Sequence, residues 1–168
     1  MTYLEIDQAL IQITRQKCEE CKNRLDEIPK ENTTERKAVQ VEYGMYAFCG
    51  NAGLLFNGSG KREFWLTKRK RFLSNRLPIY PKLASIYQAL SDEEKMCFLA
   101  ALQAELFIRD QWLGAQIAEL RAAEESGDVK RAFEFKIKVE AVETMFAAWE
   151  AWRVEHGIYP NLMEEVKQ

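Results

Sequence analysis

The chain has 168 residues, of which 47% are hydrophobic and 30% are charged. This balance excludes an intrinsically disordered protein and fits a single folded domain over residues 1–168. No run approaches the ~20 apolar residues that span a bilayer, and the N-terminus lacks the basic start and apolar run of a secretory signal. We therefore expect a cytoplasmic protein with reduced cysteines and no membrane contact.

The net charge of −2 conceals a strong division of charge along the chain. Residues 1–50 carry 7 basic and 9 acidic side chains, and residues 51–90 carry 8 basic and 1 acidic. Residues 91–168 carry 9 basic and 16 acidic side chains. Such a division indicates either a polyanionic partner or a contact between acidic and basic parts of the fold.

The first fifty residues predict a helical hairpin. Apolar residues recur at spacings of three and four from about Leu4 to Glu27, and Pro29 ends this helix because proline cannot continue the hydrogen-bond ladder. Residues 32–34, NTT, offer capping oxygens for a second helix that ends near Gly50. With only a short turn between them, the two helices are expected to run antiparallel.

A glycine-rich stretch, residues 50–60, follows and reads GNAGLLFNGSG. Four glycines and two asparagines predict a mobile loop. The pair Gly60-Lys61 resembles part of a phosphate-binding loop, but Leu55 stands where that motif has its first glycine and Arg62 replaces the hydroxyl that holds magnesium. The stretch is therefore interpreted as a hinge.

A basic helix is expected from Arg62 to about Asn75, followed by a turn framed by prolines and a short helix over 82–90. Apolar residues of the basic helix share one side, so the cations should point outward. The candidate nucleic-acid-binding residues are these cations: Lys61, Arg62, Lys68, Arg69, Lys70, Arg71, Arg76 and Lys82.

Lysine and arginine bind nucleic acid by neutralising phosphates and releasing counterions. A purely structural interpretation of the basic segment stays open beside this one. In it, the cations solvate the surface and pair with the acidic C-terminal hairpin. An amphipathic helix on an anionic membrane is a further, less favoured alternative.

The C-terminal region predicts a second helical hairpin. Residues 91–94, SDEE, match a capping box, and an apolar stripe behind them predicts one helix to about Glu125. Gly127 suits a helix C-terminal cap and Asp128 the N-cap of the next helix. That last helix is expected to stop at Gly157.

Candidate catalytic or metal-binding residues are few. Cys18 and Cys21 have the spacing of a zinc-ligand pair, but the other candidates, Cys49, Cys97 and His156, each stand alone. Two small thiols on a helix are therefore the favoured interpretation. We expect no bound metal, no cofactor and no catalytic residue.

Three charged residues interrupt the apolar pattern of the predicted helix 91–125, namely Glu105, Arg109 and Asp110. They predict either a buried polar network or a solvated edge, and the pattern does not decide between the two.

The sequence as a whole predicts an all-α helical bundle of two long antiparallel hairpins, 1–50 and 91–168, linked through residues 51–90 by the glycine loop and the basic segment. The expected function is that of a small non-enzymatic accessory protein, which binds nucleic acid or a nucleic-acid-bearing complex. The alternative is a protein-interaction module, an inhibitor or adaptor, whose basic helix docks on an acidic partner surface. DNA or RNA preference and oligomeric state do not follow from the sequence.

Overall fold

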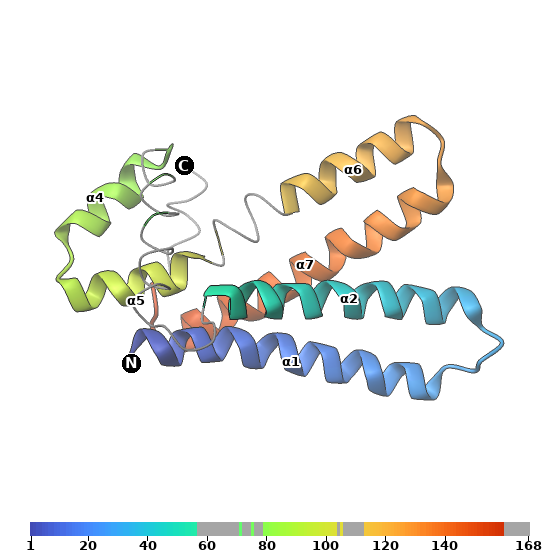
Figure 1. Ribbon diagram of the computed structural model, residues 1–168, viewed down its shortest axis with the longest axis horizontal. Helices are drawn as coiled ribbons and strands as arrows, with labels where there is room; N and C mark the ends of the chain where they lie inside the picture. Colours follow the sequence, from blue (N-terminus) through green and yellow to red (C-terminus); the bar gives the residue numbers. More distant parts are fainter. Residues whose placement is uncertain (57–70, 72–74, 76–78, 104, 106–112, 160–168) are drawn as a thin grey trace.

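The computed structural model describes residues 1–56, 71, 75, 79–103, 105 and 113–159 (Figure 1). Within these ranges the regular structure is helical and contains no strand, which confirms the all-α prediction. The α-helices are α1 (Tyr3–Glu27), α2 (Thr33–Phe56), α4 (Pro81–Ala89), α5 (Asp92–Gln103), α6 (Gly114–Glu125) and α7 (Val129–Glu155). None of the described helices is both long and apolar enough to cross a bilayer.

Local hydrogen bonds explain where α1 begins and how it turns into α2. The Thr2 hydroxyl accepts from the backbone N–H of Glu5, and the Glu5 carboxylate accepts from the backbone N–H of Thr2, a complete capping box. At the other end, the Arg36 guanidinium donates to the carbonyls of Leu25 and Ile28 at 2.6 and 2.8 Å. These bonds satisfy carbonyls that the end of α1 leaves without helical partners.

Helix α7 organises the packing of the other helices (Figure 1). It contacts α2 and α1 on one side and α6 on another, while α5 packs against α1. The tip of the α6–α7 pair lies at the opposite end of the molecule from the α4–α5 pair, while the C-terminal end of α7 runs back toward α5 (Figure 1). The largest fully buried apolar side chains of the core are Ile6, Leu10, Tyr46, Leu83, Phe98, Leu99, Leu102 and Trp149.

The first part of the predicted glycine loop is helical, because it belongs to α2. The prediction that this helix ends near Gly50 is wrong, because α2 continues to Phe56. Gly50 lies within the helix and against α1, where an added Cβ would come within 2.8 Å of the Thr14 hydroxyl oxygen. Glycine is needed there for the close approach of two helices, not for a turn. The rest of the predicted loop, residues 57–60, lies outside the described residues.

The single helix predicted from residue 91 to 125 is also corrected. The α-helical backbone of α5 ends at Gln103 and that of α6 begins at Gly114. Glu105 and Leu113 have π-helical backbone, a wider turn than the α-helix. The π-helical position 105 carries the buried Glu105 side chain, and the sequence pattern leaves open whether this charge is buried or exposed.

Candidate nucleic-acid interface

Most of the predicted nucleic-acid-binding residues lie outside the described part of the chain. These are Lys61, Arg62, Lys68, Arg69, Lys70 and Arg76. Arg71 and Lys82 are described, and both side chains are exposed. Arg71 is helical, as is Asn75 one turn later, and Asn75 is exposed too. Residues four apart share one face of a helix, so Arg71 and Asn75 belong to one exposed face, and the outward direction of the other cations stays a prediction.

Lys82 stands in the first turn of α4. Pro81 begins this helix, where its fixed φ and missing N–H are tolerated, and the N-cap residue Tyr80 does not cap the helix with its side chain. Leu83, with 0% exposure, anchors α4 in the core while Lys82 stays exposed. A helix N-terminus carries a partial positive charge. The lysine and the helix end therefore both favour an anion at this position.

Acidic side chains of α6 and α7 form ion pairs with cations that come from outside the basic segment. Glu119 of α6 pairs with Arg131 of α7. Glu134 of α7 pairs with Lys37 of α2 at 2.6 Å, and this hydrogen-bonded pair lowers the pKa of the Glu134 carboxyl. Both pairs tie neighbouring helices of the scaffold to one another. They show that part of the C-terminal acidity is neutralised without residues 61–82.

A buried ion pair answers part of the open question about Glu105. The Arg153 guanidinium of α7 donates to the Glu105 carboxylate at 3.0 Å, and both side chains have 0% exposure. Glu105 therefore belongs to a buried polar contact, whereas Arg109 and Asp110 lie outside the described residues. The sequence reasoning missed Arg153, although its position four residues after the buried Trp149 placed it on the same apolar face of α7.

The chain after α7 is fixed by the same arginine. Arg153 also donates to the carbonyl of Tyr159 at 2.6 Å, and the Tyr159 ring packs edge-on against Phe98 with centroids 5.1 Å apart. Burial raises the pKa of the Tyr159 phenol to about 12. A pocket of about 670 Å³ lies beside Tyr159, where α1, α5 and the end of α7 meet, and Glu93 and Glu94 line it. Two carboxylates make this pocket unsuited to a polyanion.

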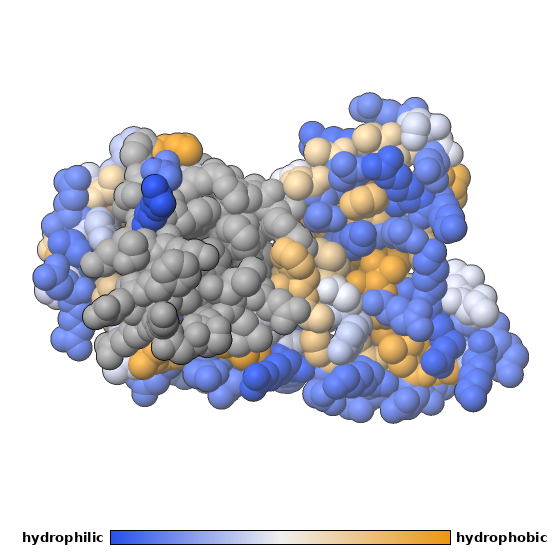
Figure 2. All heavy atoms as spheres, viewed as in Figure 1, coloured by the Kyte–Doolittle hydropathy of each residue, from blue (hydrophilic) through white to orange (hydrophobic). Residues whose placement is uncertain are grey.

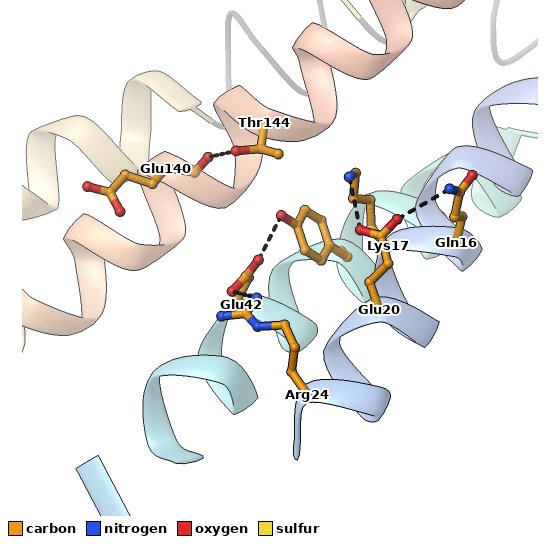
Figure 3. A network of polar contacts seen from close by, with 8 residues as sticks. Gln16, Lys17, Glu20, Arg24, Glu42, Glu140 and Thr144 are labelled. Atoms are coloured by element: carbon orange, nitrogen blue, oxygen red, sulfur yellow. Dashed lines mark hydrogen bonds and ion pairs between the residues drawn. The ribbon is translucent and has the colours of Figure 1, made fainter. Parts of the chain in front are cut away.

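A second polar network joins α1 and α2 beside α7 (Figure 3). Glu42 accepts hydrogen bonds from Arg24 at 2.8 Å and from the Tyr46 hydroxyl at 3.0 Å. Burial is the main cause that raises the pKa of Tyr46, and the Glu42 charge adds to it. The carboxylate thus satisfies the phenol of a tyrosine that is only 2% exposed. The network links the two helices of the hairpin.

The thiols and the histidine give no sign of a catalytic or metal centre. All four cysteines are free, and burial raises the pKa of each thiol, which disfavours the reactive thiolate. His156 is the C-cap residue of α7, and its Nδ1 lies 2.8 Å from the carbonyl oxygen of Trp152. In the described ranges, no three His, Cys, Asp or Glu side chains are grouped closely enough to hold a metal ion.

Comparisons with known proteins add no relative to this picture. No protein-family model, curated protein or solved structure matches the chain.

Proposed function

We propose that the protein is a small, non-enzymatic, cytoplasmic accessory protein that binds nucleic acid, or a nucleic-acid-bearing complex, through the basic segment 61–82. The helices before and after this segment serve as its scaffold. The observation that carries the proposal is the concentration of 8 basic residues against 1 acidic residue within 51–90 of a chain whose net charge is −2. Nucleic-acid phosphates are well suited to such a density of cations.

Two features of the described residues support this function. Arg71 and Lys82 are exposed, and Lys82 lies at a helix end that favours anions. The scaffold also neutralises acidic groups with its own cations, as in the pairs Glu134–Lys37 and Glu105–Arg153. These two acidic groups are therefore neutralised by residues outside the basic segment.

The test changes Lys68, Arg69, Lys70 and Arg71 together to glutamine. Binding is measured by fluorescence anisotropy with single-stranded and double-stranded DNA and RNA of unrelated sequences, at several salt concentrations. We expect affinity to fall alike for all sequences. The slope of log affinity against log salt should flatten by about 0.7–0.9 for each phosphate that the variant no longer neutralises. Thermal stability should barely change, because exposed charges contribute less than ~1 kcal/mol each.

A matched control removes the same number of exposed cations from the scaffold. It changes to glutamine the residues Arg15, Lys30, Arg121 and Lys130, all of which are exposed. We expect this control to bind nearly as well as the wild type. Equal losses of nucleic-acid affinity in both variants would mean that binding depends on net charge alone and not on the basic segment. Wild-type protein with only weak affinity for DNA and RNA would favour the alternative, a basic helix that docks on an acidic protein.

A further inference from the structure

The N-terminal half of α7 carries an apolar stripe that the rest of the described chain leaves open to solvent. Val129, Ala132, Phe133 and Lys136 are spaced by three, one and three residues, so they share one face of the helix. Val129 is 81% exposed and Phe133 is 39% exposed. Together, the exposed valine and phenylalanine make a small apolar patch on one helical face, and contiguous apolar patches can mark contact surfaces.

The stripe lines a shallow groove of about 370 Å³ at the tip of the α6–α7 pair, which points away from the α4–α5 end (Figure 1). Ala123 and Glu124 of α6, together with Gly127 and Asp128 of the turn, form the other wall. Hydrophobic residues are visible among the charged ones over the α6–α7 region in Figure 2. The groove floor is therefore apolar, and its edges are charged.

The charged residues that line the groove differ in sign along the chain. Glu124 and Asp128 line it from the end of α6 and the turn, and Lys136 lines it from α7, about two helical turns after Asp128. Neither Glu124 nor Lys136 forms an ion pair with another residue in the described part of the chain. Asp128 accepts the backbone N–H of Arg131 as the N-cap of α7. A surface with an apolar centre, one acidic end and one basic end is complementary to itself after a two-fold rotation.

Helix register gives the contacts that this rotation would make. When two copies of α7 cross antiparallel at Ala132, each position four residues after the crossing meets a position four residues before it. Lys136 of one copy then faces Asp128 of the other, where Glu124 of α6 lines the same groove, and this occurs twice. The small side chain of Ala132 lets the helices approach, and Val129 and Phe133 fill the space on either side.

We propose that the groove at the tip of α6 and α7 is the contact surface of a two-fold symmetric homodimer. The apolar stripe of each copy packs on that of the other, and Glu124 and Lys136 form reciprocal ion pairs across the axis. The proposal does not depend on nucleic-acid binding, because its evidence lies in α6 and α7 and its test needs no ligand.

The first experiment measures the mass of the full-length protein by sedimentation equilibrium over a wide concentration range. We expect a reversible monomer–dimer equilibrium for the wild type. Phe133→Glu should raise the dimer dissociation constant at least tenfold, about 1.4 kcal/mol, with an unchanged circular dichroism spectrum. Val154→Glu is the control, since Val154 is an exposed valine, 54% accessible, at the other end of α7. A wild type that stays monomeric throughout overturns the proposal.

A charge exchange then identifies the partner as a second copy. Glu124→Lys and Lys136→Glu should each weaken the homodimer, because each variant faces like charges across the axis. An equimolar mixture of the two variants should dimerise more tightly than either variant alone, because both reciprocal contacts then join a lysine of one variant to a glutamate of the other. Such rescue by mixing requires two copies in contact through these residues. Failure of the mixture to dimerise, with both single variants weakened, would overturn the proposed geometry.

Discussion

The Arg153–Glu105 ion pair offers the sharpest test of the fold. We consider Arg153→Met, which keeps the aliphatic length of the side chain and removes its charge. The guanidinium has 0% exposure and donates both to Glu105 and to the carbonyl of Tyr159. Removing one member of a buried pair leaves the other charge in a medium that solvates it poorly, and this costs about 3–5 kcal/mol. The same change also releases the chain at Tyr159.

For a domain of this size, 1 kcal/mol corresponds to about 2–4 °C in Tm. We therefore expect Tm to fall by roughly 6–20 °C, measured by circular dichroism at 222 nm and checked by urea denaturation. The matched control is Arg24→Met. Arg24 also pairs with a glutamate at 2.8 Å, but its side chain is 51% exposed, so its loss should cost less than ~1 kcal/mol.

A double variant separates desolvation from lost packing. Arg153→Met with Glu105→Leu removes both charges, and apolar pairs of similar volume commonly replace buried ion pairs at little cost or with a gain. Among the described residues, the Arg153 Nε also lacks a hydrogen-bond partner, so the arginine is not fully satisfied. We expect the double variant to regain most of the lost stability. A loss for Arg153→Met no larger than that for Arg24→Met would refute the reasoning.

Three further outcomes are expected. Gly50→Ala should lower the free energy of unfolding, measured by urea titration, by about 1–3 kcal/mol, because its Cβ would lie 2.8 Å from the stiff Thr14 side chain. Gly44→Ala, whose Cβ would meet nothing within 4 Å, should raise the same free energy by about 0.5–1 kcal/mol. In the native protein a thiol reagent should modify the two half-buried cysteines well before the two buried ones, which should react only on unfolding. The folded pKa of the Tyr159 phenol, about 12, exceeds the ordinary 10, so the contribution of this group to stability should be complete below pH 10 and lost as pH rises through 12. Ultraviolet titration of the wild type against Tyr159→Phe measures the pKa of this phenol.

The fold class could be predicted from local patterns because the signals are local. Pro29, the capping box at 91–94 and the Gly127–Asp128 turn each act within one or two helical turns, and the structure has helix boundaries at all three. In the second of these, Ser91 and Glu94 exchange hydrogen bonds at 2.8 and 3.3 Å. Such contacts need no knowledge of distant residues.

The features that the sequence did not predict depend on contacts between distant residues. Gly50 stands in a glycine-rich stretch that is typical of a loop, yet it lies in α2 against Thr14, 36 positions earlier. Glu105 breaks an apolar pattern, and only the return of α7 brings Arg153 to it, 48 positions later. A pattern read along one helix cannot tell a buried charge from an exposed one when its partner comes from another helix.

The proposed dimer and the proposed nucleic-acid interface bear on each other through valency. A dimer carries two copies of the basic segment 61–82, and a long polyanion can engage both, so the second contact becomes intramolecular and raises the apparent affinity. A variant such as Phe133→Glu should then weaken binding to long nucleic acids and leave binding to short oligonucleotides nearly unchanged. Neutralising residues 68–71 should weaken both. The two measurements assign a loss of binding either to the cations that contact phosphate or to the number of segments that act together.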